Sequence, residues 1–206
     1  SDSQNLVLSV GCALNSLCNG KIMESNKFNN LFVPYSPGDA GGAIGAAFTT
    51  YYKFTNKKRV FEMKHAYWGT SFNNNQISDC LKKNEKIIEN QKCSLKLISD
   101  NNVLNRIVAN DISEGKVVGW FQGKMEWGPR ALGNRSILGD PRRSDMKDIL
   151  NLKIKRRESF RPFAPSILRE HVSDWFKNDD EVPFMMKVYQ IKEDKRIDIP
   201  AVTHVD

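Results

Sequence analysis

The residues most suited to chemistry lie in one basic, glycine-rich stretch between residues 119 and 161. From residue 124 to residue 161 there are eleven lysines and arginines against five acidic residues, a local charge of +6 in a chain whose net charge is +7. The rest of the sequence is therefore nearly neutral. Positive charge concentrated among glycines favours a site for a compact, highly charged anion, and phosphate is the first candidate.

Four of these cations are the strongest candidates for holding the anion, because they stand beside glycine or proline or alternate within the motif: Arg130, Arg135, Lys155 and Arg161. Arginine can grip two phosphate oxygens at once, whereas lysine supplies a point charge. We expect the other cations to be solvated or paired with acidic neighbours (Arg142, Arg143, Lys147 and Arg157, near Asp145, Asp148 and Glu158).

A glycine-rich junction at residues 38–47 predicts the start of a helix that a ligand can approach closely. Gly41 and Gly42 leave the N–H groups of the first helical turn accessible to an anion or a nucleotide. Asp39 has two interpretations: it caps the helix, or it extends a carboxylate to a metal at the phosphates. Gly11 follows a predicted strand in a similar turn, which is a weaker signal because such turns are commonly structural.

The pattern of apolar and turn residues predicts an α/β or α+β protein. Strands are expected at residues 6–10, 31–34, 95–98, 116–121, 136–138, 163–168 and 184–191. Helices are expected from the glycine-rich junction to about residue 54, and at 76–90, 101–113, 145–155 and 171–176. We expect two units, residues 1–92 and residues 93–206.

Composition excludes several classes of protein. Among the 206 residues 40% are hydrophobic and 27% are charged, and no apolar run approaches the roughly 20 residues that span a bilayer. The four cysteines fit neither a zinc site nor a dense disulfide framework, so we expect reduced thiols and a cytoplasmic location. The start without methionine and the strand-like end indicate a piece of a longer protein.

Short motifs are spread over nearly the whole chain. They are residues 13–15 (ALN), 19–20 (NG), 37–47 (PGDAGGAIGAA), 123–138 (GKMEWGPRALGNRSIL), 140–142 (DPR), Asn151, 153–158 (KIKRRE), 160–166 (FRPFAPS) and 200–206 (PAVTHVD). With these motifs the chain resembles the middle and C-terminal part of the O-carbamoyltransferases of nodulation and antibiotic tailoring. The block from Glu126 to Ser136 is long and highly specific.

The resemblance implies a two-domain enzyme. Residues 1–92 would be the tail of an actin- or sugar-kinase-like domain that binds nucleotide and a divalent metal, expected to be iron, and transfers the carbamoyl group to a hydroxyl. Residues 93–206 would be a truncated YrdC-like domain that forms carbamoyl-adenylate from carbamoyl phosphate and ATP. The partners expected from the family are therefore carbamoyl phosphate and a small-molecule acceptor, with no membrane.

The resemblance also implies roles for single residues. Nucleotide-cradling positions are matched by Gly11, Asn15, Gly41 and Gly42, and a metal-binding carboxylate by Asp39. The two histidine ligands of that metal belong to a segment before Ser1, so the metal site would be incomplete in this chain. Basic positions that hold carbamoyl phosphate and the adenylate are matched by Lys155, Arg161 and Arg130. Further substrate contacts are expected from Arg135, Ser136 and His204.

One position departs from the family pattern. Val10 stands where the first of two glycines is usual, and Cys12 replaces a valine. A β-branched residue cannot adopt a positive φ cheaply. We therefore expect this turn to approach the nucleotide less closely.

Two other functions are compatible with the sequence. A threonylcarbamoyl-type tRNA-modifying protein shares the YrdC-like fold but uses bicarbonate and threonine. A basic nucleic-acid-binding module requires phosphate contacts that weaken with salt, and the focused charge disfavours it. The sequence leaves open the acceptor, which could be a sugar, an aminoglycoside, a cephem or a lipo-oligosaccharide, and the oligomeric state.

Overall fold

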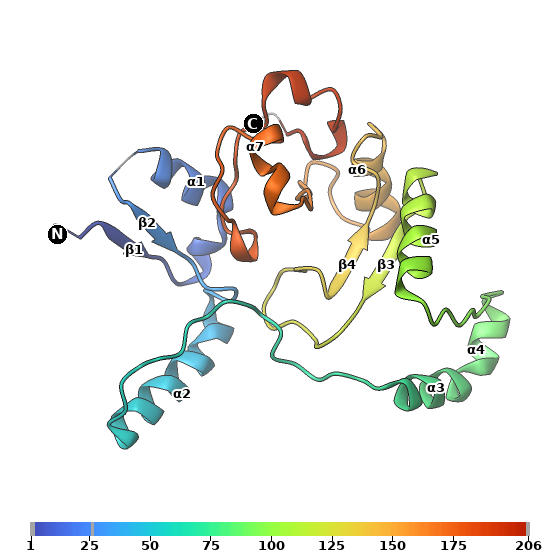
Figure 1. Cartoon of the computed structure of the whole chain (residues 1–206), viewed down its shortest axis with the longest axis horizontal. Helices are drawn as coiled ribbons and strands as arrows, with labels where there is room; N and C mark the ends of the chain where they lie inside the picture. Colours follow the sequence, from blue (N-terminus) through green and yellow to red (C-terminus); the bar gives the residue numbers. More distant parts are fainter. Residues whose placement is uncertain (1–2, 26, 205–206) are drawn as a thin grey trace.

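The computed structural model describes residues 3–25 and 27–204, which form short strands and helices (Figure 1). The first two strands, β1 (Asn5–Val7) and β2 (Asn30–Phe32), pair in parallel, with Leu6 opposite Leu31. A parallel pair needs a crossover connection. The turn η1 (Gly11–Leu14) and the helix α1 (Ser16–Glu24) provide it, so the Gly11 turn lies just beyond the end of β1.

The longest helix, α2 (Asp39–Thr55), follows the glycine-rich junction and contributes no buried residue within the described ranges. It extends away from the β1–β2 pair (Figure 1). The helices α3 (Asn74–Lys83) and α4 (Glu85–Asn90) are also without buried residues. Across residues 3–25 and 27–204, none of the helices combines the length and the apolar character that crossing a membrane requires.

The basic loop belongs to an antiparallel hairpin. Its strands are β3 (Val118–Phe121) and β4 (Arg135–Leu138), and residue Gly119 pairs with Ile137. The helix α5 (Asn101–Ser113) runs beside this hairpin (Figure 1). After β4, the short helix α6 (Met146–Asp148) continues into a π-helical turn, η2 (Ile149–Ile154).

The C-terminal segment has little regular structure, yet it completes the core. It contains α7 (Val172–Trp175) and the 3₁₀ turns η3 (Arg169–His171), η4 (Pro183–Met185), η5 (Glu193–Lys195) and η6 (Pro200–Val202). One core cluster joins residues from both ends of the chain: Ala13, Val33, Tyr35, Ala66, Phe184 and Met186. The C-terminal segment therefore packs on the β1–β2 unit, while the expected boundary at residues 92 and 93 stays a prediction.

Several predicted elements are confirmed and others are wrong. The helices near α2 and α5 and the strands β3 and β4 form as expected. Residues 95–98, 163–168 and 184–191 form no strand, apart from an isolated bridge between Phe176 and Ile191, because no neighbouring strand is in place to pair with them. The expected helix at 145–155 is mostly a π turn, whereas the turn predicted at Gly11 leads into a helix, α1, as expected. The last two residues of the closing motif, 205 and 206, lie outside the described residues.

Candidate functional site

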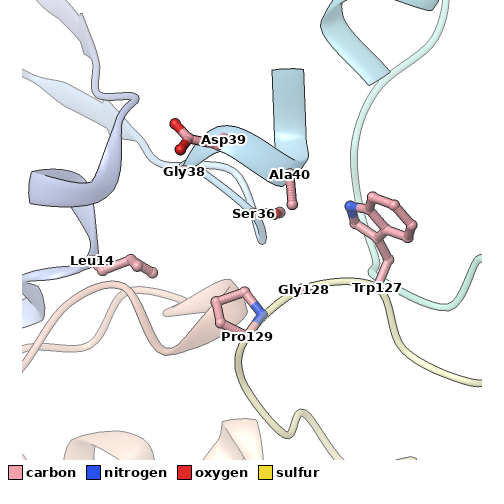
Figure 2. A pocket seen from close by; sticks show the side chains of 8 residues that line it. All are labelled: Leu14, Ser36, Gly38, Asp39, Ala40, Trp127, Gly128 and Pro129. Carbon is pink, nitrogen blue, oxygen red and sulfur yellow. The ribbon is translucent and has the colours of Figure 1, made fainter. Parts of the chain in front are cut away.

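A pocket of ≈ 420 Å³ lies where the N-terminus of α2 faces the loop that follows β3 (Figure 2). It is lined by residues from three separate parts of the sequence: Leu14, Ser36, Gly38, Asp39, Ala40, Trp127, Gly128 and Pro129. The first turn of a helix has N–H groups without intrahelical partners and a partial positive charge. This end of α2 therefore favours negative charge, although the surface that lines the pocket is almost entirely apolar. The glycine-rich junction and the basic loop, far apart in sequence, meet here.

Gly128 determines how closely the basic loop approaches the segment before α2. Its φ is +118°, and a Cβ built on it would lie 2.6 Å from the carbonyl oxygen of Tyr35. Beside it, the amide of Trp127 donates to the carbonyl oxygen of Ala66 at 2.7 Å. Any side chain at position 128 would push the two segments apart. Glycine is therefore required to close the pocket.

Arg130 follows the pocket wall directly and is anchored on two backbone carbonyls. One terminal nitrogen donates to the carbonyl oxygen of Met185 at 2.9 Å, and the other donates to that of Leu14. The side chain is half-buried and has no carboxylate partner within residues 3–25 and 27–204; burial lowers the pKa of its guanidinium. A partly buried cation neutralised only by carbonyl dipoles favours an anionic ligand nearby.

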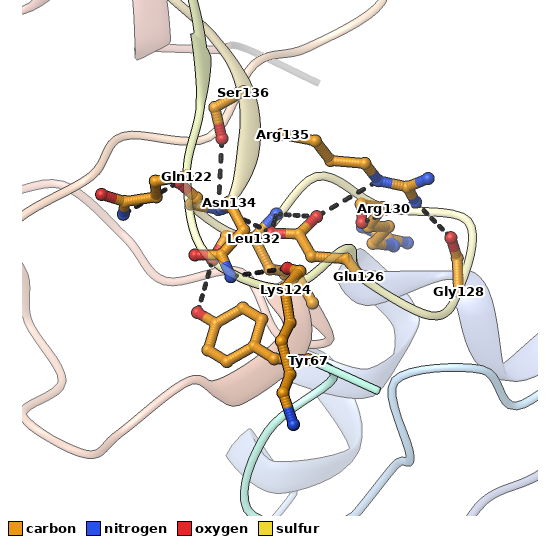
Figure 3. A network of polar contacts seen from close by, with 11 residues as sticks. Tyr67, Gln122, Lys124, Glu126, Gly128, Arg130, Leu132, Asn134, Arg135 and Ser136 are labelled. Carbon is orange, nitrogen blue, oxygen red and sulfur yellow. Dashed lines mark hydrogen bonds and ion pairs between the residues drawn. The ribbon is translucent and has the colours of Figure 1, made fainter. Parts of the chain in front are cut away.

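The loop from Glu126 to Ser136 is folded around one buried carboxylate (Figure 3). The side chain of Glu126 has no exposed surface. It accepts hydrogen bonds from the backbone amides of Leu132 at 2.9 Å and Asn134 at 2.7 Å, and from the Nε–H of Arg135 at 3.2 Å. These charge-assisted bonds offset the cost of burying the carboxylate.

Arg135 and Ser136, predicted as substrate contacts, are both engaged inside this loop. A terminal nitrogen of Arg135 donates to the carbonyl oxygens of Gly128 and, at 3.2 Å, of Arg130. The hydroxyl of Ser136 accepts from the amide of Gly133 at 3.1 Å. The contacts of both side chains hold the loop, and their role in substrate binding stays a prediction.

A second polar cluster surrounds Asn151, which is fully buried. Its Nδ2 donates to the carbonyl oxygens of Ser159 at 3.1 Å and Arg161 at 2.9 Å, and its Oδ1 accepts the Nε–H of Arg157 at 2.7 Å. The guanidinium of Arg157 lies over the ring of Phe163, 4.9 Å from its centroid. Burial lowers the pKa of Arg157, and Arg161 adds to the effect. The expectation of a solvated or carboxylate-paired Arg157 is therefore wrong.

Lys155 and Arg161 lie beside this cluster and are accessible. Arg161 donates to Glu158 at 2.8 Å, and the two side chains are 51% and 55% exposed. Lys155 is exposed, and its ammonium has no hydrogen-bond or ion-pair partner in the described part of the chain. Neither residue lines the pocket at α2. The structure therefore separates these two cations from Arg130, instead of gathering all three at that pocket.

His204 approaches the same cluster from the C-terminal end. Its Nε2 lies 3.2 Å from the carbonyl oxygen of Phe163 and 3.3 Å from the amide nitrogen of that residue. Its Nδ1 is buried and lacks a hydrogen-bond partner among the described residues. Buried polar atoms are nearly always hydrogen-bonded. An unsatisfied ring nitrogen next to Arg157 and Phe163 is consistent with a ligand site there.

Two further arginines of the basic stretch, Arg142 and Arg143, are neutralised by their neighbours. Arg143 pairs with Asp145 at 2.7 Å, as expected, whereas Arg142 pairs with Asp140 at 2.7 Å instead of with the acids predicted. The hydrogen bond from Arg142 lowers the pKa of Asp140. Only part of the local charge is thus available to a ligand.

Two parts of the chain match models of known protein families. Residues 1–48 match the family described as Carbamoyltransferase N-terminus, and residues 109–206 match Carbamoyltransferase C-terminus. The chain belongs to the carbamoyltransferase family. The pocket at α2 draws on both matched segments, because the start of α2 lies in the first and residues 127–129 lie in the second.

Curated relatives agree with this assignment. The chain is 40% identical to the protein sll1178 of Synechocystis, 40% identical to the nodulation protein NolNO of Sinorhizobium fredii, and 32% identical to the 3'-hydroxymethylcephem-O-carbamoyltransferase of Streptomyces clavuligerus. Each comparison covers 98% of this chain, but only 36%, 29% and 35% of the respective relative. The chain therefore spans about a third of the length of these curated relatives.

The nucleotide positions implied by the family have distinct local roles. A Cβ on Gly41 would lie 1.9 Å from the carbonyl oxygen of Ser36, so glycine is required for the tight entry into α2. Gly42 and Gly11 are exposed, with open space where a Cβ would be. The side chain of Asn15 accepts from the amide of Cys18 at 3.0 Å and caps α1. Their contact with a nucleotide stays a prediction.

Val10 adopts a backbone conformation that favours glycine. Its φ is 77° and its ψ is 169°, a region that glycine occupies almost alone. Its amide donates to the carbonyl oxygen of Pro37 at 2.6 Å. This hydrogen bond holds the turn against the segment before α2, although the backbone of Val10 is strained. The expectation that the turn approaches a nucleotide less closely stays a prediction.

Asp39 is the first residue of α2 and not its cap. The N-cap is Gly38, without a side-chain cap bond, so the capping interpretation of Asp39 is wrong. Its carboxylate is exposed and points away from Trp127 and Pro129 (Figure 2). Residues 3–25 and 27–204 contain no group of three or more His, Cys, Asp or Glu side chains that could hold a metal. Asp39 alone does not form a metal site, and the chemistry proposed below uses none.

Three polar residues that organise the sites were not anticipated as site residues. They are Glu126, Asn151 and Asn19, whose Nδ2 donates to the carbonyl oxygens of Ala13 and Met186, both at 2.9 Å. Each belongs to one of the short motifs, whereas the predicted site residues are mainly cations and glycines. A polar side chain inside a specific glycine-rich or basic motif was the signal that could have identified them.

Proposed function

We propose that this chain is part of an ATP-dependent O-carbamoyltransferase. In the proposed reaction, water hydrolyses carbamoyl phosphate to carbamate and inorganic phosphate, and a carbamate oxygen attacks the α-phosphorus of ATP, which forms carbamoyl-adenylate and releases pyrophosphate. A hydroxyl of a small-molecule acceptor then attacks the carbonyl carbon and loses its proton, and AMP leaves. The name of the cephem relative, 3'-hydroxymethylcephem-O-carbamoyltransferase, supports this class of reaction. A cytoplasmic location, where both phosphate-bearing substrates are available, is part of the proposal.

The observation that carries the proposal is the position of Arg130 beside the pocket at α2. The N-terminus of α2 borders the pocket, and the half-buried guanidinium of Arg130 donates to the carbonyl oxygen of Leu14, which lines it. Two positive elements around one pocket suit the phosphates of a nucleotide. We therefore assign ATP or the adenylate to this pocket, with Gly41 and Gly42 allowing close approach.

Carbamoyl phosphate is assigned to the cluster around Asn151. Lys155 has no partner among the described residues, and Arg161 has only the exposed carboxylate of Glu158. A phosphate with two charges replaces that single carboxylate favourably, because the planar guanidinium can bind two phosphate oxygens at once. The unsatisfied Nδ1 of His204 supplies a further polar group for the carbamoyl end. Two separate cationic groups agree with a reaction that uses two phosphate-bearing substrates.

Calorimetric titration of the chain tests both assignments. We expect Lys155→Ala and Arg161→Ala each to weaken the binding of carbamoyl phosphate by about tenfold or more, because each removes a charge-assisted hydrogen bond. Arg130→Gln should weaken ATP binding by a similar factor. The matched control is Arg143→Gln, which removes an arginine that Asp145 already neutralises. Unchanged affinity for carbamoyl phosphate in both Lys155→Ala and Arg161→Ala would rule out the assignment.

The contacts also bear on the two other functions. Four arginines of the basic stretch are ion-paired (Arg135, Arg142, Arg143 and Arg161), so the stretch is not a free polycationic surface for nucleic acid. Filter binding of RNA and DNA at about 100 mM salt separates this function, since a nucleic-acid module would retain them. Replacing carbamoyl phosphate by bicarbonate and threonine in the titration tests the threonylcarbamoyl alternative.

A further inference from the structure

We propose that Glu126 and Arg135 form a positioning pair, which holds residues 128–130 against α2 without touching the ligand. The proposal rests on the proposed function, because it explains how the Arg130 side of the pocket is kept in place. Glu126 was not predicted as a site residue. Arg135 was predicted to contact the substrate, whereas in this proposal it acts through the backbone of Gly128 and Arg130.

The carboxylate of Glu126 closes the loop by binding its far end. Both of its oxygens lie near the amide of Leu132, at 2.9 Å and 3.0 Å, and one also accepts from the amide of Asn134 at 2.7 Å. These amides belong to the chain segment returning to β4, whereas Glu126 belongs to the segment leaving β3. The two sides of the loop are thus tied by one buried negative charge.

Arg135 connects Glu126 to the backbone that forms one wall of the pocket. Its Nε–H donates to Glu126, and a terminal nitrogen of the same guanidinium donates to the carbonyl oxygens of Gly128 and Arg130 (Figure 3). These two carbonyls flank Pro129, which lines the pocket. The planar group therefore links the buried carboxylate to the backbone from which the Arg130 side chain departs.

Arg135 has few donors left for a substrate. Its Nε and one terminal nitrogen are engaged inside the loop, and the side chain as a whole is 38% exposed. Arg143 and Asp145, by contrast, are 41% and 56% exposed and pair only at the surface. The pair Arg143–Asp145 thus has the same chemistry in the same basic stretch without a loop to hold, and it provides the control.

The structural part of the test is amide hydrogen exchange, measured by NMR on the ¹⁵N-labelled chain. In Glu126→Gln, the side-chain NH₂ replaces one acceptor oxygen, so the amides of Leu132 and Asn134 should exchange at least about tenfold faster. The amides of α5 should be unchanged, which shows that the fold persists. Asp145→Asn should leave Leu132 and Asn134 unchanged. Unaltered exchange at both amides in Glu126→Gln would overturn the proposal.

The functional part is a titration of the same variants with ATP. Glu126→Gln and Arg135→Gln should each weaken ATP binding by about tenfold, and the double variant should be little weaker than either single one, since both changes break one unit. Arg135→Lys separates positioning from direct contact. It keeps the charge but loses the fork, so it should bind as weakly as Arg135→Gln. Affinity restored to near the wild-type value would identify Arg135 as a ligand contact and overturn its positioning role.

The two readouts keep this proposal distinct from the proposed function. If the wild-type chain binds no ATP, the assignment of the pocket fails, while hydrogen exchange still decides whether Glu126 holds the loop. If Glu126→Gln does not fold, Arg135→Gln is read at the same amides, where exchange as slow as in the wild type contradicts the proposed pair.

Discussion

The loop from Glu126 to Ser136 and the segment from Asn151 to Arg161 both carry arginines, but they differ in what they bury. The first buries a charged carboxylate, and its Arg135 is neutralised from inside. The second buries a neutral amide that holds the backbone of Ser159 and Arg161. A buried carboxylate is stable only while a cation pairs with it, whereas a buried amide is neutral and does not require the nearby cations as partners. The first region is therefore a framework, and the second is the region that we propose as an exchangeable anion site.

The largest effect is expected from Glu126→Ala, which removes the buried carboxylate. Arg135 and the amides of Leu132 and Asn134 then lose their acceptor in a site with little access to water. We expect the free energy of unfolding to fall by about 3–5 kcal/mol, the usual cost of breaking a buried ion pair. Urea denaturation measures it. A loss below about 1 kcal/mol would contradict the role of this loop as framework.

Asn151→Ala tests the second region, in which the buried polar group is a neutral amide. It deletes three hydrogen bonds, and the charge that loses an acceptor, the guanidinium of Arg157, is only partly buried, so the loss in unfolding free energy should be smaller, about 2–3 kcal/mol. Asn102→Ala on the exposed side of α5 is the control and should stay within about 0.5 kcal/mol of the wild type. If Asn151→Ala costs as much as Glu126→Ala, the distinction between the two regions fails.

Gly128→Ala tests whether the framework also depends on backbone geometry. The added Cβ meets the carbonyl oxygen of Tyr35. The φ of +118° at position 128 is also strained for any residue other than glycine. We expect a loss of about 1–3 kcal/mol. Gly119→Ala is the control, since open space surrounds that position, and it should change the free energy of unfolding by about 0.5 kcal/mol or less. Equal effects in both variants would show that the close approach is unimportant.

How far the sequence predicts this molecule depends on how local the deciding contacts are. The helices α2 and α5 and the hairpin β3–β4 follow from apolar periodicity and glycine signals within each segment. The π turn η2 does not follow from such signals. It depends on the backbone amide of Lys155, which donates to the carbonyl oxygen of Leu150 in place of the acceptor that an α-helix would use. The three wrong strands had suitable residues but no partner strand, which periodicity cannot supply.

The sites divide in the same way. Residue types and spacing identify the basic stretch and the junction before α2, and the pocket does join them. The anchoring of Arg130 on Met185 joins positions 55 residues apart, and that of Asn19 on Met186 joins positions 167 residues apart. Nothing in either segment alone indicates these contacts. Val10 shows a further limit, because its strained φ of 77° opposes the local preference of valine and is imposed by its surroundings.

Of these substitutions, Glu158→Gln should change the stability of the fold least, and it tests the comparison of the two regions most directly. Glu158 and Arg161 are both exposed, so the denaturation midpoint should hardly move. Binding of carbamoyl phosphate should instead strengthen severalfold, because the ligand no longer competes with a carboxylate for Arg161.

The effect of Glu158→Gln has a defined pH dependence. A backbone hydrogen bond and Arg161 lower the pKa of Glu158. The carboxylate therefore stays ionised at neutral pH and becomes protonated only well below it. The ratio of the dissociation constants of wild type and variant should be constant near pH 7 and approach one as the pH falls through that lowered pKa. A ratio of one at pH 7 would mean that Arg161 never exchanges its partner, and the second region would then be framework like the first.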